Sequence, residues 1–585
     1  MTCRNAQALA LGEKLGDPFD ASAPLSHEQS MRWDEAEHFP REGLDILQSA
    51  GAWRAFVPSA LGGDLGGYDE LLGVARVIAS RDLTVAVTAS AMIWSTLIWI
   101  GGDQRLREQH AASILAGRTP CLAYSEESHG ADLLMNDTIA SPCAGGYLVS
   151  GKKWPINRAT TGDSVVLLAR SGERNDPRGS SLFWFEKSSL AAGSFRSLPR
   201  AATLGVRGCD ISGIEFDGAF VPASQRLGAE GAGLELALKG FHVTRTLCAG
   251  LSLGAIDAAL RTTLRLVQTR RLYGNAVLAL PQVRWTMVES YALLRALDAA
   301  SLAATRLLHV SPEQSALISA VVKHAIPAVA EQIASRLATI HGARFFLRDH
   351  HDHGLMQKIY RDNLLISIFD GSSPINLHAL GSQLSVNARF GSEAAGRRPD
   401  PARARAERER AALACSIDEP PPPFDPSRLE LVSRGADDII GSLGQLIQEL
   451  DERLLRDACG ARLLAQLGEL RAAVREVLVR FEPSAEGPQR SSSMAPARAA
   501  GAARYALLYV AAAAAQVWWR SHGAHTLRAE PWLVVALAGL LGEGLAVTAP
   551  AEAESFAQAL LPELLEGSSR PDGYHYAHTK KARTA

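Results

Sequence analysis

The chain has 585 residues, of which 47% are hydrophobic and 21% are charged, and its formal net charge is −2. This length predicts several domains, and the composition is that of a soluble globular protein. A net charge so close to zero argues against nucleic acid or an anionic membrane as the main partner. The seven cysteines are scattered and form no CxxC pair, which argues against structural zinc and a disulfide framework and predicts a reducing, cytoplasmic location.

The hydrophobic pattern divides the first two-thirds of the chain into a helical, a β and a second helical region. Helical spacing of apolar residues predicts an N-terminal helical domain at residues 1–118. Short alternating runs such as YLVSGKKW and SVVLLAR, separated by Gly, Asp and Pro, predict a central β domain at 119–228. Helical periodicity returns at 229–390, where we expect a helical bundle.

The last third of the chain predicts a linker, a second helical module and a tail. Residues 391–428 hold an Arg-rich run and four consecutive prolines. We interpret them as a solvated linker with helical tendency, with a docking surface as the alternative. Residues 429–567 predict an extra helical domain, and residues 568–585 a flexible tail. The apolar stretches at 83–100, 505–519 and 532–547 predict buried helices, because they are too short or too interrupted by polar residues to span a bilayer.

Two segments of the β region have residues suited to a flat heterocycle. CLAYSEESHGADLLMNDTIA, residues 121–140, places the Ser125 hydroxyl and the flexible Gly130 in a polar turn, where backbone N–H groups can approach a ligand closely. GKKWPIN, residues 151–157, offers the aromatic face of Trp154 and the amide of Asn157. Each segment also has an ordinary interpretation, as a turn before a strand and as a Trp in a β core.

Two segments of the helical region carry charged groups beside glycine turns. In RRLYG, Arg270 and Arg271 precede a turn, which suits a pyrophosphate or, alternatively, a solvated helix face. In IFDGSSPIN, Asp370 follows an apolar helix, where desolvation disfavours a charged carboxylate and makes it a better base. The alternative role of Asp370 is an N-cap of the next helix, and the segment alone favours this cap.

The sequence RDHHDH at 348–353 offers three histidines and two aspartates as possible metal ligands. Consecutive residues cannot all face one ion, so we expect a polar loop here, and we predict no metal site.

Taken in this order, the segments resemble the acyl-CoA dehydrogenase family over roughly residues 27–390. SEESHGAD is similar to the family's TEPxAGSD, RRLYG to R-x-x-FG, IHGARFF to IHGGxGY and IFDGSSPIN to IYEGTSEIQ. The stretch GVRGCDISGIEFDGAFVPASQRLG is similar to the family's G-x-R-x-SDT…VP…LG region. The resemblance implies an α+β, mainly α fold: an N-terminal helical domain, a central β-barrel-like domain and a C-terminal helical bundle, followed here by the extra helical domain.

The same resemblance implies a cofactor, FAD, and roles for individual residues. Asp370 stands where the family has its catalytic Glu, which removes the α-proton of an acyl thioester while the β-hydrogen leaves as hydride to flavin N5. The implied cofactor-binding residues are Tyr124, Ser125, Gly130, Ala131, Trp154, Asn157, Arg270, Tyr273, Thr339, Gly342 and Ser372. Arg270 and Tyr273 match residues that reach the FAD of a neighbouring subunit, which implies a homodimer. Thr244 occupies the family's other position for the base, and a hydroxyl cannot serve there.

Several positions depart from the family pattern and leave the reaction open. Asp370 is one methylene shorter than Glu, Ala131 lacks the usual hydroxyl, and Thr339 and Ala343 replace Gln and Gly. The interpretations are an acyl thioester dehydrogenase, a flavin oxidase or monooxygenase of the nitroalkane-oxidase kind, or a catalytically degenerate scaffold. The implied partners are an acyl-CoA or acyl-carrier-protein thioester and an electron acceptor such as electron-transferring flavoprotein.

Overall fold

The computed structural model describes residues 6–390, 401–455, 457–482, 496–521, 529–542, 550–570 and 574. These residues form two compact units. The β unit comprises Lys14–Gly66 and Arg81–Leu247, and the helical unit comprises Gly67–Ser80 with the described residues of Met1–Glu13 and Cys248–Ala585. The chain runs through helices, then strands, then helices, which confirms the predicted fold class.

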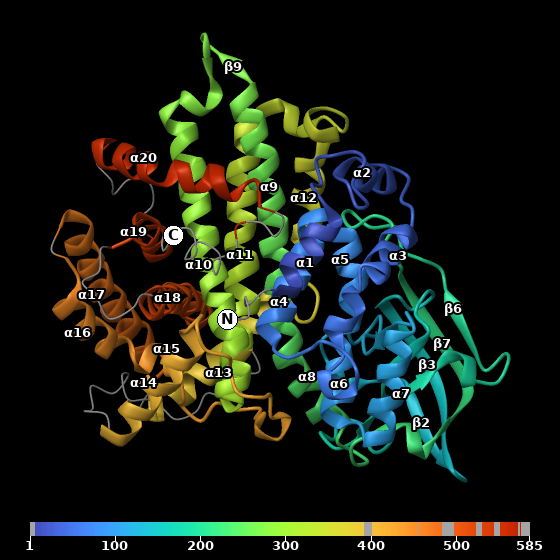
Figure 1. Cartoon of the computed structure of the whole chain (residues 1–585). Helices are drawn as coiled ribbons and strands as arrows, with labels where there is room; N and C mark the ends of the chain where they lie inside the picture. Colours follow the sequence, from blue (N-terminus) through green and yellow to red (C-terminus); the bar gives the residue numbers. More distant parts are fainter. Residues whose placement is uncertain are drawn as a thin grey trace. The chain divides into compact units, whose positions relative to one another are not determined.

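The strands of the β unit form an eight-stranded sheet, which lies beside the helices of this unit (Figure 1). Its strands are β1 (Pro120–Ala123), β2 (Ile139–Cys143), β3 (Gly146–Asn157), β4 (Ser164–Arg170), β5 (Ser180–Glu186), β6 (Phe195–Leu198), β7 (Ile211–Pro222) and β8 (Arg226–Leu227). Their order is β6-β7-β3-β2-β4-β5-β8, and β1 pairs with β4. Strands β1 and β2 run parallel to β4, and the other neighbours are antiparallel.

The burial of each strand follows from its place in the sheet. Strand β4 is apolar almost throughout and is buried from Ser164 to Ala169, as expected of a strand covered on both faces. Strand β3 instead alternates between buried and more exposed residues, because successive side chains point to opposite faces. The pairing of β3 with β7 shifts register between Lys153 and Ile156. Pro155 lies within this shift, and its lack of an N–H prevents a regular ladder there.

Six helices belong to the β unit. They are α2 (His27–Glu35), α3 (Arg41–Ser49), α5 (Leu83–Ser90), α6 (Thr96–Gly101), α7 (Gln104–Leu115) and α8 (Gly233–Leu247), and α1 (Ala6–Leu15) has residues in both units. Asp82 is the N-cap of helix α5, and its carboxylate accepts from the N–H groups of Thr84 and Val85 at 2.6 and 3.1 Å. The Asn157 amide donates to the Val87 carbonyl at 2.8 Å, which ties the end of β3 to α5.

The helical unit contains the predicted bundle and the predicted extra module. The bundle consists of α4 (Tyr68–Arg81), α9 (Ala249–Thr269), α10 (Pro281–Val310), α11 (Ser315–His341), α12 (Leu355–Asn363) and α13 (Ser373–Phe390), with a hairpin of β9 (Arg271–Leu272) and β10 (Asn275–Ala276). The later helices are α14 (Pro401–Cys415), α15 (Asp438–Gly441), α16 (Leu443–Arg453), α17 (Ala458–Val479), α18 (Pro496–Arg520), α19 (Pro531–Leu541) and α20 (Pro550–Gly567).

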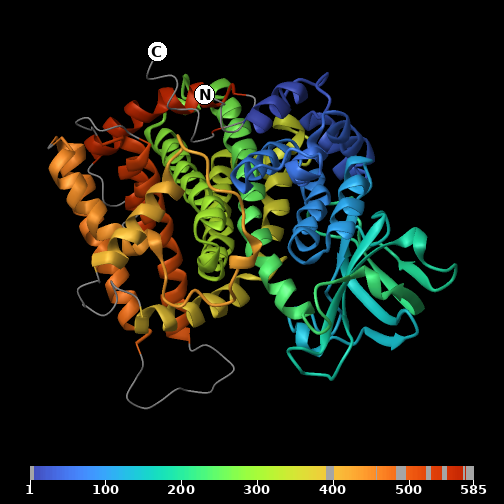
Figure 2. The same ribbon diagram turned by 60° about the horizontal axis from the view of Figure 1, so that its bottom comes forward.

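Helix α10 joins the bundle to the later helices. It contacts α9 and α11 of the bundle and also α14, α18, α19 and α20, which lie beside it in both ribbon views (Figures 1 and 2). Every residue from Met287 to Val310 is therefore buried, whichever face of the helix it occupies. A helix that is buried all round belongs to a core. The extra module thus completes a core of the helical unit and packs directly on the bundle.

Parts of the predicted linker and of the predicted tail have a defined place in the helical unit. Residues 401–415 of the predicted linker form α14, in which Arg403 pairs with Glu407 at 2.7 Å and Arg410 with Asp438 at 2.7 Å. Arg397 and Arg398 lie outside the described residues. The predicted tail is also largely outside them, but Tyr574 is described and is buried, with its ring 5.6 Å from that of Tyr291.

Three helical stretches of the described residues are long and apolar enough to cross a membrane by length and composition alone. They are Leu83–Gly101, Gly233–Thr269 and Pro312–Phe346, and 94, 100 and 78% of their most apolar windows is buried in the fold. The first of them includes the stretch at 83–100 that the sequence predicts to be buried helix.

Candidate active site

The segments predicted to contact the flavin ring lie side by side in the β unit. Tyr124 and Ser125 directly follow β1, and Trp154 lies in β3. The Trp154 N–H donates to the Ser125 carbonyl at 3.0 Å, so the two segments are joined through their backbones. The Tyr124 ring is buried, with its centroid 6.0 Å from those of Trp94 and Phe241.

Asn157 and Thr244 supply polar atoms that suit a ligand. The buried Oδ1 of Asn157 and the buried Oγ1 of Thr244 have no hydrogen-bond partner among the described residues. A buried polar atom without a hydrogen-bond partner lowers the stability of the fold by about 1–3 kcal/mol. A bound group with complementary polar atoms would restore this stability. A flavin ring carries both N–H donors and carbonyl acceptors. The residues of the β unit therefore fit this cofactor.

Gly130 and Ala131 lie in the exposed turn that follows the Tyr124–Ser125 segment. A Cβ added to Gly130 would meet no atom within 4 Å, so the backbone of this turn is open to a ligand.

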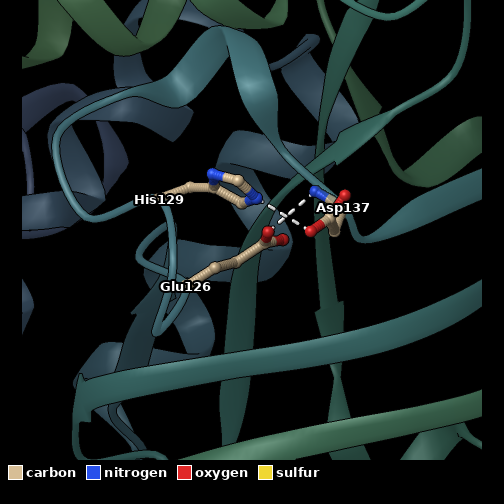
Figure 3. Close-up of side chains that lie close together, drawn as sticks. All are labelled: Glu126, His129 and Asp137. Atoms are coloured by element: carbon tan, nitrogen blue, oxygen red, sulfur yellow. Dashed lines mark hydrogen bonds and ion pairs between the residues drawn. The ribbon is translucent and has the colours of Figure 1, made fainter.

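The same turn contains three side chains with metal-ligand atoms, Glu126, His129 and Asp137 (Figure 3). Both Glu126 oxygens are already hydrogen-bonded: one accepts from the Asp137 N–H at 2.7 Å, and the other from the Thr138 N–H at 2.9 Å and its hydroxyl at 2.7 Å. His129 lies 2.8 Å from the Asp137 carboxylate. The cluster is thus explained as a hydrogen-bonded turn, in which Glu126 holds the segment 137–138 against 124–126.

The predicted base, Asp370, lies in a tight turn of the helical unit between residues 364–367 and α13. Asp370 has φ +54° and Gly371 φ +94°, both in the left-handed region. A non-glycine residue is uncommon there, and such residues cluster at functional sites. The Asn376 side chain holds the turn by donating to the carbonyls of Gly371 and Ser372 at 2.6 and 3.1 Å.

Two further contacts fix the surroundings of Asp370 within the helical unit. The thiol of the buried Cys248, at the start of α9, donates to Asp370 Oδ2 at 3.7 Å. The buried Lys323 of α11 donates to the Ile366 carbonyl and lies 4.9 Å from the centre of the Phe369 ring. Asp370 itself is half-buried. The contacts from Cys248 at α9 and from Lys323 of α11 hold the turn that carries it.

Arg270 and Tyr273, which are predicted to reach a neighbouring subunit, lie just before β9 and at the tip of the β9–β10 hairpin. Thr339 and Gly342, which are predicted to bind FAD, lie in α11 and just after it. Tyr273 is 91% exposed at the tip of the β9–β10 hairpin, which projects beyond α9 and α10 in Figure 1. Gly342, at the end of α11, has φ +63° and open space where a Cβ would lie. The exposed Thr339 uses its hydroxyl to donate to the Ser335 carbonyl at 3.0 Å.

The histidine-rich loop is tied to α9. Asp352 accepts from the Thr262 hydroxyl at 2.7 Å and lies 3.2 Å from His351 Nε2 and 3.3 Å from Arg265 Nε. The pKa of Asp352 is lowered to about 2: burial opposes this shift, and the hydrogen bonds from His351 and Thr262 outweigh it. Asp352 therefore anchors the polar loop to α9.

Comparison with known proteins places these segments in a family. The family "Acyl-CoA dehydrogenase, middle domain" matches residues 121–219, and "Acyl-CoA dehydrogenase, C-terminal domain" matches residues 231–385. The chain belongs to the acyl-CoA dehydrogenase family. It is accordingly an FAD-dependent oxidoreductase that acts on CH–CH groups, and the general reaction is the dehydrogenation of an acyl thioester.

Individual relatives of this acyl-CoA dehydrogenase family member act on different thioesters. It is 24% identical to cyclohex-1-ene-1-carbonyl-CoA dehydrogenase of Geobacter metallireducens over 61% of this chain and 93% of that protein. It is 27% identical to L-prolyl-[peptidyl-carrier protein] dehydrogenase of a Serratia species over 37% of this chain and 56% of that protein. The fold of butyryl-CoA dehydrogenase from Megasphaera elsdenii is similar, with a TM-score of 0.58 and 20% identity over 65% of this chain and 96% of that one.

Three residues that contact the predicted site residues were not predicted from the sequence. Cys248 is a lone cysteine in a helical stretch, and nothing in its neighbourhood points to Asp370, 122 residues away. Glu126 and Lys153 stand beside predicted flavin contacts, but each has a neighbour of the same type, Glu127 and Lys152. The alternation of side chains along β3 could have indicated Lys153, because it places one of two adjacent lysines on the buried face of the sheet.

Proposed function

We propose that Asp370 removes the α-proton of an acyl thioester while the bound FAD accepts the β-hydrogen as hydride. The observation that supports Asp370 most is its position in a left-handed turn, with its carboxylate next to the Cys248 thiol. The product is the α,β-unsaturated thioester, so the proton ends on Asp370 and the hydride on the cofactor.

The chain's own groups have distinct tasks in this reaction. Asp370 accepts the proton, and we infer that its backbone N–H helps to stabilise the charge that develops on the thioester oxygen. Holding the carboxylate on an anchored turn supports its role, because a misplacement on the order of 1 Å can cost about a hundredfold in rate. Tyr124, Ser125, Trp154 and Asn157 would orient the flavin ring, and Gly130 and Ala131 would contact the pyrophosphate or the thioester.

The further features of the reaction are proposals of the same kind. We infer that the substrate is a thioester of coenzyme A or of a carrier protein, since relatives of both kinds are named above. An electron-transferring flavoprotein is the proposed acceptor, since a relative 22% identical to this chain is named as a subunit of the caffeyl-CoA reductase-Etf complex of Acetobacterium woodii. We also propose a homodimer, in which Arg270 and Tyr273 contact the FAD of the partner subunit. Thr339, Gly342 and Ser372 are further proposed FAD contacts.

The test is anaerobic bleaching of the flavin by CoA and carrier-protein thioesters of several acyl groups. We expect at least one thioester to bleach the wild-type spectrum and Asp370→Asn to abolish bleaching with FAD still bound. Asp45→Asn, on an exposed face of α3, is the matched control and should bleach as the wild type does. Bleaching by Asp370→Asn at the wild-type rate would remove Asp370 as the base. Rapid reoxidation by air would identify a flavin oxidase or monooxygenase.

A further inference from the structure

Lys153 is a buried cation in the middle of the flavin-binding part of the β unit. Its side chain is 0% exposed, whereas that of the adjacent Lys152 is 48% exposed and pairs with Glu127 at the surface. Burying an ammonium group is costly unless its hydrogen bonds are satisfied. Its place in the core therefore calls for a specific explanation.

All three N–H groups of the Lys153 ammonium have acceptors. They are the Glu126 carboxylate at 2.9 Å, the Asn136 side-chain oxygen at 2.7 Å and the Tyr124 carbonyl at 3.0 Å. Asn136 in turn donates to the Leu168 carbonyl of β4 at 3.0 Å. Lys153 thus connects the end of β1, the 126–138 turn and β4 to strand β3.

Lys153 and Trp154 both hydrogen-bond to the segment that follows β1. Lys153 donates from its side chain to the carbonyl of Tyr124, and Trp154 donates from its backbone to the carbonyl of Ser125. Two consecutive residues of one predicted flavin segment therefore hold two consecutive carbonyls of the other. This happens where β3 leaves its regular ladder with β7, so the backbone of the sheet does not by itself fix the position of Trp154.

We propose that Lys153, paired with Glu126, is a positioning residue that sets the placement of Tyr124 and Ser125 relative to Trp154 and thereby the affinity for FAD. The inference rests on the proposed role of these segments in flavin binding. Lys153 acts through the backbone of the Tyr124–Ser125 segment and is not assigned a contact with the cofactor.

The ionisation of Lys153 makes the proposed role testable, because it predicts a pH dependence of FAD affinity that a purely structural role of Lys153 does not. Burial lowers the pKa of Lys153 to about 8, and the Glu126 carboxylate limits this shift. The other charged group of the network is Asp137, with His129 and Arg174 on its outer side. Raising the pH from 7 to 9 removes the Lys153 charge and weakens the pair, so FAD affinity should fall over this range.

The experiment measures FAD dissociation constants by flavin fluorescence at pH 7, 8 and 9. We expect Lys153→Met to weaken FAD binding at least tenfold at pH 7, which corresponds to about 1.4 kcal/mol, and to lose the fall in affinity toward pH 9. Lys152→Met is the matched control, and it should stay within about twofold of the wild type at each pH and retain the wild-type pH profile. Lys153→Arg, which keeps the charge at pH 9, should bind more tightly than Lys153→Met.

Several outcomes would overturn the inference. The first is a Lys153→Met protein with the same FAD affinity and pH profile as Lys152→Met. The second is a Lys153→Met protein whose apoprotein is less stable to urea but whose folded form binds FAD like the wild type. Either result leaves Lys153 a purely structural residue. If Lys153→Met does not fold, a wild-type affinity that is constant from pH 7 to 9 overturns the inference. Because the assay uses FAD without a thioester, a failure of the proposed reaction would leave this comparison intact.

Discussion

The Cys248 thiol lies 3.7 Å from Oδ2 of Asp370 and donates a hydrogen bond to it. Cys248 is at the start of α9 and Asp370 at the turn before α13, so the contact joins two elements that are 122 residues apart in sequence. A thiol is a weak donor, and its bond constrains the carboxylate less tightly than a hydroxyl would. We infer that the contact orients the proposed base.

Removing the thiol should slow proton abstraction without removing FAD. A hydrogen bond contributes about 1 kcal/mol on average, so we expect Cys248→Ala to slow flavin bleaching by roughly fivefold. Cys248→Ser supplies a donor of similar size and should recover most of the rate. The measurement is the anaerobic bleaching rate with the best thioester. Equal rates for Cys248→Ala and the wild type would show that the contact does not orient the base.

A second buried cation, Arg76, should be essential for the stability of the helical unit. Its guanidinium lies 2.6 Å from Asp257 and 2.9 Å from Asp298, and all three side chains are at most 1% exposed. Arg76→Met leaves two buried carboxylates without their cation, which we expect to lower the free energy of unfolding by about 3–5 kcal/mol. Arg54→Met breaks the exposed pair with Asp64 and should leave the free energy of unfolding nearly unchanged. Urea unfolding of both variants gives the comparison, and similar losses for the two would contradict it.

The extra module should make stability depend on pH through Asp437. This buried carboxylate accepts from the Tyr505 hydroxyl and from the Ile440 N–H, and burial raises its pKa to about 7. Because the folded-state pKa lies above the unfolded value, the contribution to stability is complete below about pH 4. It is lost as the pH rises to about 7, and it amounts to roughly 4 kcal/mol at most.

Asp437→Asn removes the charge and keeps the shape of the side chain. Its amide oxygen can accept from the Ile440 N–H as Oδ1 does, and its NH2 group, in the place of Oδ2, can donate to the Tyr505 hydroxyl oxygen. We expect the variant to be more stable than the wild type at pH 8 and to lose much of this advantage at pH 5, as measured by urea unfolding. Asp418→Asn, on an exposed loop, should follow the wild type at both values. A stability difference between Asp437→Asn and the wild type that is the same at pH 5 and pH 8 would rule out titration of Asp437 as its source.

The exposed tip of the β9–β10 hairpin should be needed for assembly if the proposed homodimer forms. Tyr273→Ala removes a ring that is 91% exposed in the single chain, so the fold should keep its stability. We expect weaker dimers in sedimentation and a lower FAD affinity that depends on protein concentration. Leu204→Ala, which removes another highly exposed side chain, is the control. A Tyr273→Ala protein that dimerises and binds FAD normally would exclude this hairpin from the subunit contact.

Much of the architecture follows from local patterns in the sequence. The alternation in β3, the apolar run of β4 and the helical spacing of α9 to α13 each reflect a short-range rule, so the helical–β–helical order and the β segment between residues 120 and 227 could be predicted. The motif around Asp370 likewise needs only consecutive residues, although its local pattern alone favoured a helix cap.

Tertiary packing determined which side chains are buried and which residues far apart in the sequence are in contact. The period of two places Lys152 and Lys153 on opposite faces of β3, but only the sheet's packing shows that Lys153 is the buried one and that Tyr124, Glu126 and Asn136 are its acceptors. The sequence by itself determined the residue types of the site and the elements that carry them. The Cys248–Asp370 contact and the burial of α10 beneath the later helices were decided by the fold alone, because they depend on long-range contacts that close only when a shared core forms.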